Sequence, residues 1–312
     1  MNRQTTRISP ADVDRQRDFC QKLHERFAAR PSAPLAFVDT YGCQQNEADS
    51  EKLRGYLRAM GFDFTQDEFA ADVVVMNTCA VREHAETRVF GNVGALTHTK
   101  ARNPEQIIAV CGCMAQQEHV AEKLKKSYRI VDLVFGPHEL WRFPELLRSV
   151  CTEHRRVFAI DPADGSVAEG IPRQRDGSVK AWLSIMYGCN NFCSYCIIPY
   201  ARGRVRSLPL EQCAREARTL AEAGYQEIVL TGIEISSWGQ DTRPSSSALT
   251  VRNRATRHRA GRKAIWSTWS ERSRTVRARY FIMARASSGW AANSRLSSSR
   301  SMGTSSQGVM AT

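Results

Sequence analysis

Between residues 35 and 150, short apolar runs rich in β-branched residues alternate with longer stretches of helical periodicity. The apolar runs predict strands at 35–40, 72–77, 106–110 and 130–135. The stretches after them predict helices at 46–60, 80–99, 115–126 and 137–150. Apolar strands separated by helices of this length are typical of βαβ units with a parallel sheet. The pattern therefore predicts an α/β domain over residues 34–150, preceded by a polar extension (1–33) with an exposed helix at 12–29.

A second βα series follows residues 151–178, which carry several Pro and Gly residues without periodicity and predict a linker. It consists of a strand at 179–186, a helix at 210–223 that ends at Gly224, and a strand at 227–230. The pattern stops there, so we expect the second domain to extend only from 179 to 241.

The positive charge of the chain lies in its last part. Residues 242–312 contain 14 Lys and Arg but one acid, Glu271, for a net charge of +13, whereas residues 1–241 hold 30 basic and 31 acidic residues. No period persists in this Arg- and Ser-rich segment, so we predict a tail without regular structure. Its composition is typical of a GC-rich gene read in another frame. The alternative is a genuine disordered basic tail that adheres to RNA.

Targeting signals are not evident, and the chain is rich in cysteine. No run of about 18 apolar residues predicts a membrane span, and the N-terminus lacks the apolar stretch of a signal peptide. We therefore expect a cytoplasmic protein. Ten cysteines in such a chain indicate metal or redox chemistry rather than a disulfide framework.

The first cysteine motif is a CxxxCxxC on the loop after strand 179–186, formed by Cys189, Cys193 and Cys196. Three thiolates at these offsets suit three corners of a 4Fe–4S cluster and leave the fourth iron open to S-adenosylmethionine. The alternative is a structural zinc site, which would need four ligands, usually as two CxxC pairs.

The second set of cysteines follows three predicted strand ends. Cys43, Cys79 and Cys113 are separated by about one βαβ unit each, and in a parallel sheet such positions converge at the carboxyl edge, where ligands bind. They suit a second cluster; the alternative is three scattered buried thiols. Cys111 shares a strand face with Cys113, and spacing does not choose between them. Cys213, in contrast, lies on an apolar helix stripe and is predicted to be core.

Four motifs carry a family resemblance: TYGCQQNEADSEKL (40–53), NTCAVREHAETRVFGNVGAL (77–96), CGCMAQQE (111–118) and YGCNNFCSYCIIPYARGRVRS (187–207). They resemble the radical-SAM methylthiotransferases over about residues 33–241. The second motif is similar to the branch that acts on N6-isopentenyladenosine 37 of tRNA. LTGIEISSWGQD (230–241) is closer to the threonylcarbamoyladenosine branch.

The resemblance implies a site. It assigns an auxiliary 4Fe–4S cluster to Cys43, Cys79 and Cys113, choosing Cys113 over Cys111, and the radical-SAM cluster to Cys189, Cys193 and Cys196. It places Tyr195 on the adenine of S-adenosylmethionine and Glu234 near the methionyl end. Arg202, Arg204 and Arg206 would meet tRNA phosphates, the alternative being a solvated basic face.

The implied activity is methylthiolation of C2 of N6-isopentenyladenosine 37, beside the anticodon of tRNA. The alternative substrate is threonylcarbamoyladenosine 37. The implied partners are a tRNA anticodon stem-loop and a low-potential electron donor such as flavodoxin, and the implied state is a monomer. The rest of the radical-SAM partial barrel and the family's C-terminal RNA-binding TRAM domain have no counterpart in 242–312. We therefore expect an incomplete barrel in a truncated or out-of-frame chain, which puts activity in question. The alternative is a non-catalytic cluster-binding fragment with a tail that adheres to RNA.

Overall fold

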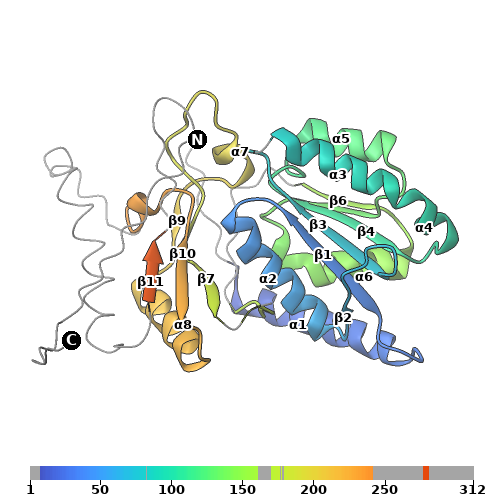
Figure 1. Ribbon diagram of the computed structural model, residues 1–312, viewed down its shortest axis with the longest axis horizontal. Helices are drawn as coiled ribbons and strands as arrows, with labels where there is room; N and C mark the ends of the chain where they lie inside the picture. The colour runs from blue at the N-terminus through green and yellow to red at the C-terminus, as the bar shows by residue number, and fades with distance from the viewer. Residues whose placement is uncertain are drawn as a thin grey trace, which may run out of the picture. The chain divides into compact units, whose positions relative to one another are not determined.

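A six-stranded parallel sheet forms the centre of the first half of the chain (Figure 1). The computed structural model describes residues 8–81, 83–160, 170–175, 177 and 179–241, with the backbone alone for 83–84 and 277–280. The strand order is β2-β1-β3-β4-β5-β6. The strands are β1 (Leu35–Tyr41), β2 (Asp63–Phe64), β3 (Val73–Thr78), β4 (Ile107–Gly112), β5 (Leu133–Phe135) and β6 (Val157–Ala159).

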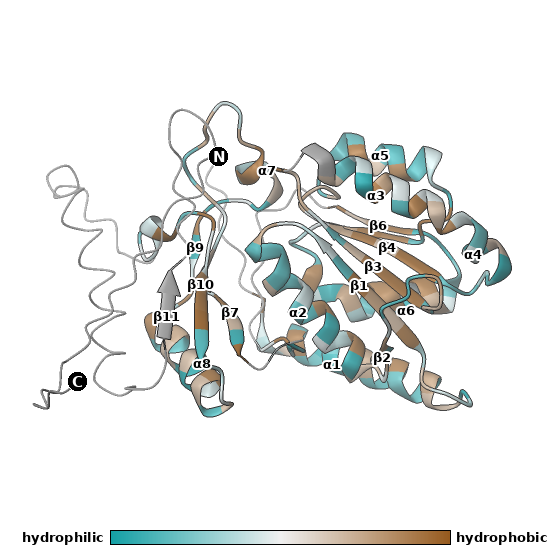
Figure 2. Cartoon of the chain, in the orientation of Figure 1, coloured by the Kyte–Doolittle hydropathy of each residue, from teal (hydrophilic) through white to brown (hydrophobic). Residues whose placement is uncertain are grey.

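Helices cover both faces of this sheet. One face packs against α1 (Pro10–Ala28), α2 (Gln44–Ala59) and α6 (Phe143–Glu153), and the other against α3 (Glu83–Ala95) and α5 (Glu118–Ser127). Successive β3 residues alternate between the two cores: Val73 and Val75 face α2, while Val74 and Met76 face α3. Burial on both faces explains the continuous apolar runs in the central strands β3, β4 and β5 (Figure 2). The predicted α/β fold is confirmed.

The second βα series forms a three-stranded parallel sheet of order β11-β10-β7. Its strands are β7 (Lys180–Ser184), β10 (Glu227–Thr231) and β11 (Arg277–Tyr280). The helix α8 (Leu210–Glu222) packs its stripe of Cys213, Ala217 and Leu220 on this sheet, so Cys213 is a core residue as predicted. A short antiparallel ribbon, β8 (Met186–Tyr187) with β9 (Arg206–Ser207), encloses the cysteine loop and the turn α7 (Ile198–Ala201).

Several boundaries differ from the prediction. The helix expected at 80–99 is divided into α3 and α4 (Thr97–Arg102), and the one expected at 137–150 begins as a 3₁₀ turn, η1 (Leu140–Arg142). The predicted linker begins with the end of α6 and with β6, which is too short to show a period. Another 3₁₀ turn, η2 (Ile235–Ser237), follows β10.

The N-terminal helix is part of the core rather than exposed. Ser9 caps it by accepting a 3.1 Å hydrogen bond from the backbone of Asp12, and Pro10 occupies its first turn. Cys20, Leu23 and Phe27 lie on one stripe and pack with α2 and α6. The sequence prediction missed this contact because it depends on α2 and α6, which follow later in the chain.

The predicted tail contains a strand, contrary to our expectation. The backbone of Arg277–Tyr280 pairs in parallel with β10, whose edge would otherwise present unpaired N–H and C=O groups. The other tail residues, 242–276 and 281–312, and residues 161–169 of the predicted linker lie outside the described residues, and the domain limits stay predictions. Within the described part of the chain, no helix has the length and apolarity to cross a bilayer.

Candidate functional site

The first cysteine trio lies at the carboxyl edge of the six-stranded sheet. Cys43 follows β1 and caps α2, Cys79 follows β3, and Cys113 follows β4. The strand order reverses between β1 and β3, and open α/β sheets bind ligands at such a point. Side-chain hydrogen bonding between Cys43 and Cys79 lowers the pKa of Cys43 and raises that of Cys79. The Cys113 thiol interacts electrostatically with both.

Two asparagines that the sequence analysis did not single out hold this edge together. Asn46 donates from Nδ2 to Asn77 Oδ1 at 3.0 Å and to the Thr78 carbonyl at 3.1 Å. Asn77 donates back to the Asn46 carbonyl at 2.8 Å and to Ser50 Oγ at 2.9 Å. A polar pair, Asn77-Thr78, at the end of an otherwise apolar strand was the available signal.

Cys111 and Cys113 have different surroundings despite their spacing. Cys111 is packed in the apolar core with Leu133 and Phe135, and burial raises its pKa well above the usual value. Gly112 has a φ of 95°, which turns the chain after it. Cys113 follows this turn and receives a 2.9 Å hydrogen bond from Arg202 Nε.

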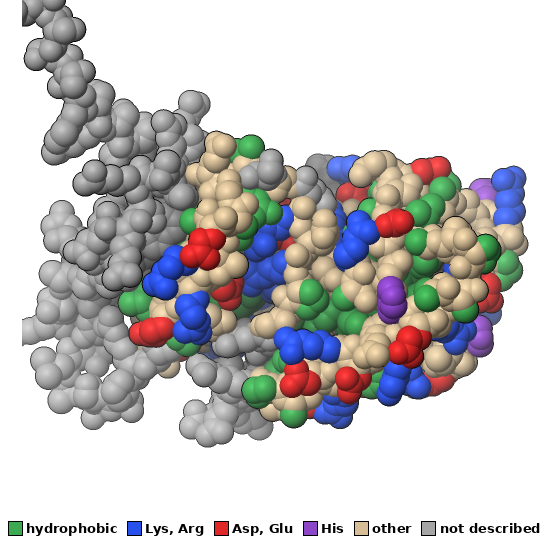
Figure 3. Space-filling model, turned by 90° about the horizontal axis from the view of Figure 1, so that it is seen from below, with side chains coloured by type: hydrophobic (Ala, Val, Ile, Leu, Met, Phe, Trp, Pro, Cys, Tyr) green, Lys and Arg blue, Asp and Glu red, His purple; other side chains and the backbone are tan. Residues whose placement is uncertain are grey.

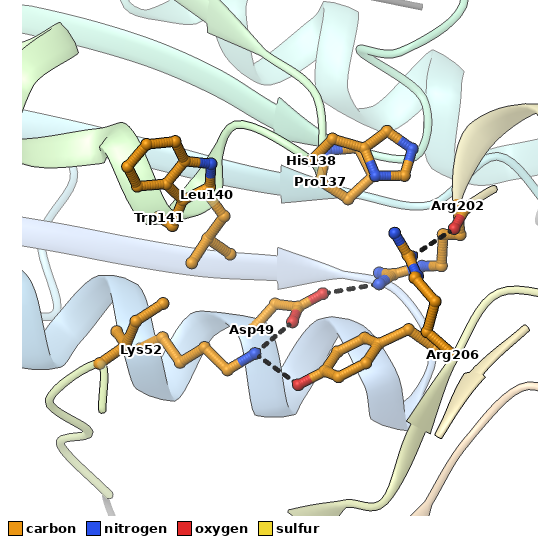
Figure 4. A pocket seen from close by; sticks show the side chains of 10 residues that line it. Asp49, Lys52, Pro137, His138, Leu140, Trp141, Arg202 and Arg206 are labelled. Carbon is orange, nitrogen blue, oxygen red and sulfur yellow. Dashed lines mark hydrogen bonds and ion pairs between the residues drawn. The ribbon is translucent and has the colours of Figure 1, made fainter. Parts of the chain in front are cut away.

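Arg202 also belongs to a buried ionic network between α2 and the cysteine-loop segment (Figure 4). Its Nη1 donates to Asp49 Oδ2 at 2.8 Å, and Lys52 Nζ lies 3.3 Å from Asp49 Oδ1. Lys52 also donates to the Tyr187 hydroxyl at 3.1 Å. Burial alone would raise the pKa of Asp49, but Arg202 and Lys52 outweigh it and hold this pKa below the usual value. The carboxylate therefore stays ionised inside the protein.

A cavity of about 30 Å³ adjoins this network, bounded by Asp49, Lys52, Tyr187 and the segment Pro137–Trp141 (Figure 4). His138, which the sequence analysis expected to be solvated, is buried there. Burial first, and then Arg206 and Arg202, lower its pKa to about 3. His138 is therefore neutral at physiological pH.

The second cysteine trio lies on the loop between β8 and α7. Cys189 is buried and Cys193 and Cys196 are half-buried, and burial raises the pKa of Cys189. The loop turns through residues with positive φ, Gly188 at 68° and Phe192 at 43°. The charge of Glu234 acts on Cys189, so these two predicted site residues lie close together. Tyr195, next to Cys196 in the sequence, is 70% exposed.

The three arginines after this loop do not form an exposed run. Arg202 and Arg206 are buried, whereas Arg204 is exposed and lies 5.1 Å from the centre of the Phe192 ring. RNA contact stays a prediction for all three. On the face of the molecule seen in Figure 3, acidic and basic side chains are interspersed, in agreement with the near-neutral composition of residues 1–241.

The donor chemistry of both trios fits iron–sulfur clusters. Within the described ranges, no three His, Cys, Asp or Glu side chains surround a position for a single metal ion. Ligands of a cubane cluster bind separate iron atoms and need not converge in that way. The fit of the first trio rests on three neighbouring thiols at one sheet edge and on a buried guanidinium bonded to one of them, which suits an anionic thiolate set.

Two family models match the chain. The model of Uncharacterized protein family UPF0004 matches residues 36–136, and that of the Radical SAM superfamily matches residues 183–268. The first match covers the six-stranded sheet as far as β5, with Cys43, Cys79 and Cys113. The second begins in β7 and includes Cys189, Cys193 and Cys196.

Two curated relatives carry the name tRNA-2-methylthio-N(6)-dimethylallyladenosine synthase. The protein from Clostridium tetani is 47% identical over 211 residues, 68% of this chain and 47% of the relative. The protein from Acetivibrio thermocellus is 43% identical over 244 residues, 77% of this chain and 51% of the relative. The chain thus spans about half the length of the curated relatives it matches. Among solved structures, the radical S-adenosylmethionine methyltransferase TsrM from Kitasatospora setae aligns with a TM-score of 0.43 and 16% identity, over 66% of this chain and 48% of that one.

Proposed function

The chain belongs to the radical-SAM methylthiotransferase family, and from this premise we propose that it methylthiolates C2 of N6-isopentenyladenosine 37 in tRNA. The observation that carries the proposal is the presence of two separate cysteine trios, one in each matched domain. The name shared by the curated relatives supports the isopentenyladenosine branch over the threonylcarbamoyladenosine branch.

The chemistry of the target atom explains why a radical-generating cofactor is needed. A C–H bond at C2 of an adenine is far too weak an acid for a side-chain base to deprotonate. When bound, the cluster at Cys189, Cys193 and Cys196 with S-adenosylmethionine supplies a carbon-centred radical strong enough to remove that hydrogen. The protein contributes binding, orientation and exclusion of water.

Different residues of the chain bind the auxiliary cluster and S-adenosylmethionine. Cys43, Cys79 and Cys113 would hold the auxiliary cluster, which would supply the sulfur of the methylthio group. Tyr195, exposed next to Cys196, covers the adenine of S-adenosylmethionine, and Glu234, close to Cys189, lies toward its methionyl end.

Arg204 supplies an exposed positive charge at the same loop for the tRNA anticodon stem-loop. An unstacked loop base would enter the site, in the usual manner of RNA recognition. Flavodoxin or a similar low-potential protein would deliver the electron.

The test is complementation of a strain from which the gene has been deleted, with tRNA nucleosides measured by mass spectrometry. We expect the 2-methylthio form of isopentenyladenosine to vanish on deletion and to return with the intact gene, but not with Cys43→Ala or Cys189→Ala. Cys20→Ala is the matched control, because Cys20 is buried in the core and lies in neither trio. Unchanged nucleosides after deletion would refute the proposal. Loss of 2-methylthio-threonylcarbamoyladenosine instead would assign the other branch.

A further inference from the structure

Arg202 and Gly203, adjacent in the sequence, connect the two trios: Arg202 contacts a cysteine of the first, and Gly203 contacts a cysteine of the second. The guanidinium of Arg202 donates from Nε to Cys113 Sγ at 2.9 Å. The carbonyl of Gly203 accepts a 3.1 Å hydrogen bond from the backbone N–H of Cys189. The carbonyl of Arg202 itself accepts a 2.8 Å hydrogen bond from Arg206 Nη2. The backbone that carries the Arg202 side chain is therefore held in place.

The surroundings of Arg202 indicate a functional role for its charge. Its side chain is 4% exposed, and removing a cation from water costs several kcal/mol unless partners offset the loss. Asp49 is shared between Arg202 and Lys52, so two buried cations face one buried carboxylate. Nη2 of Arg202 has no hydrogen-bond partner among the described residues. A negative charge at the sulfur of Cys113 would balance this network.

We propose that Arg202 is a positioning residue for the auxiliary cluster: it orients the Cys113 sulfur and raises the reduction potential of the cluster. This inference rests on the ligand set given under the proposed function. Hydrogen bonds to ligand sulfurs and the net charge of the surroundings set the potential of iron–sulfur clusters. A one-electron reduction adds one negative charge to the cluster, so a neighbouring guanidinium stabilises the reduced form more than the oxidised form.

The experiment is a potentiometric titration with dithionite under anaerobic conditions, followed by electron paramagnetic resonance. It uses the full chain carrying Cys189→Ala, Cys193→Ala and Cys196→Ala, so that the auxiliary cluster alone gives the signal. We expect Arg202→Gln to move the midpoint potential to a more negative value. Arg202→Lys keeps the charge but loses the planar fork of donors and should give a smaller shift. Arg218→Gln is the matched control, because Arg218 is exposed on α8 and its replacement should leave the potential unchanged.

A second variant keeps the test decisive if Arg202→Gln does not fold. Asp49→Asn removes the anion that partly neutralises Arg202 while keeping the side-chain shape, so it should move the potential to a more positive value. Parental potentials in the folded Arg202 variants and in Asp49→Asn would overturn the inference. A parent chain without any cluster signal would instead overturn the ligand set itself, and this inference with it.

Discussion

Asn46, in the first turn of α2, and Asn77, near the end of β3, exchange hydrogen bonds, from Asn46 Nδ2 to Asn77 Oδ1 at 3.0 Å and from Asn77 Nδ2 to the Asn46 carbonyl at 2.8 Å. Each is a few residues from a cysteine of the first trio: Asn46 follows Cys43 in the first turn of α2, and Asn77 precedes Cys79. The pair therefore sets the separation of Cys43 and Cys79.

Replacement of Asn77 should weaken both the fold and the first cluster site. Asn77→Ala removes two donated hydrogen bonds and the one accepted from Asn46, while the Ser50 hydroxyl keeps Thr40 and Asn46 Nδ2 keeps the Thr78 carbonyl as partners. We expect a loss of about 1–3 kcal/mol in the free energy of unfolding, since each buried hydrogen bond contributes about 0.5–1.5 kcal/mol. Chemical denaturation checks the stability, and iron analysis checks cluster occupancy. The matched control is Asn103→Ala, at an exposed position, where a change within about 0.5 kcal/mol is expected. Equal effects of the two replacements would argue against the role of Asn77.

Gly112 is required by the turn that places Cys113. Its φ is 95°, and a Cβ atom there would lie 2.4 Å from the carbonyl oxygen of Thr78. We expect Gly112→Ala to lower the free energy of unfolding by more than the roughly 1–2 kcal/mol of the left-handed conformation alone. Thermal or chemical unfolding gives the value.

Gly224→Ala separates the strain of the left-handed conformation from the contact with Thr78. Gly224 has a φ of 90°, but nothing lies within 4 Å of the added Cβ atom. Its replacement should therefore cost only the conformational strain. If Gly112→Ala costs no more than Gly224→Ala, the contact with Thr78 is unimportant.

His138 should make the cluster-free chain less stable in acid. Its pKa is lowered to about 3 by burial and by Arg206 and Arg202, with Asp49 opposing, while the unfolded chain titrates near the ordinary value of about 6.5. The unfolded state therefore binds one more proton between these pH values, so stability is fully present above about 6.5 and falls as the pH drops toward 3.

The corresponding variant is His138→Gln. We expect it to reduce the slope of the unfolding free energy against pH in this window. The reduction should be at most about 1.4 kcal/mol per pH unit, which corresponds to one proton. Urea unfolding at a series of pH values measures the slope. His119→Gln, at an exposed position, should leave it unchanged. A slope in His138→Gln identical to that of the parent would contradict the prediction.

Arg204 should contribute one phosphate contact if the loop meets RNA. Arg204→Ala is expected to weaken binding of an anticodon stem-loop and to reduce the slope of log affinity against log salt by about one unit. Fluorescence anisotropy at several salt concentrations measures both. Arg218→Ala, exposed on α8, carries the same charge change away from the loop. The charge of residues 242–312 is present in both variants. Equal losses of RNA affinity in Arg204→Ala and Arg218→Ala would therefore show that Arg204 acts only through net charge.

The sequence by itself determined the order of the main strands and helices from 35 to 150, because apolar runs and helical periods are local properties. It missed the two-residue strand β2, which is too short to show a period. It also placed both cysteine trios correctly after the predicted strands, since each position depends only on where a strand ends. The separation of the basic tail from a near-neutral body followed from composition alone.

Tertiary structure decided which of the polar residues are buried. Arg202, expected to meet phosphates or solvent, is paired inside the protein with Asp49, 153 residues earlier in the chain, and His138 is buried beside the same network. The packing of α1 and the pairing of β11 also depend on distant segments. Burial and ion pairing arise only when such segments come into contact, and a local pattern of residues does not predict contacts between distant segments.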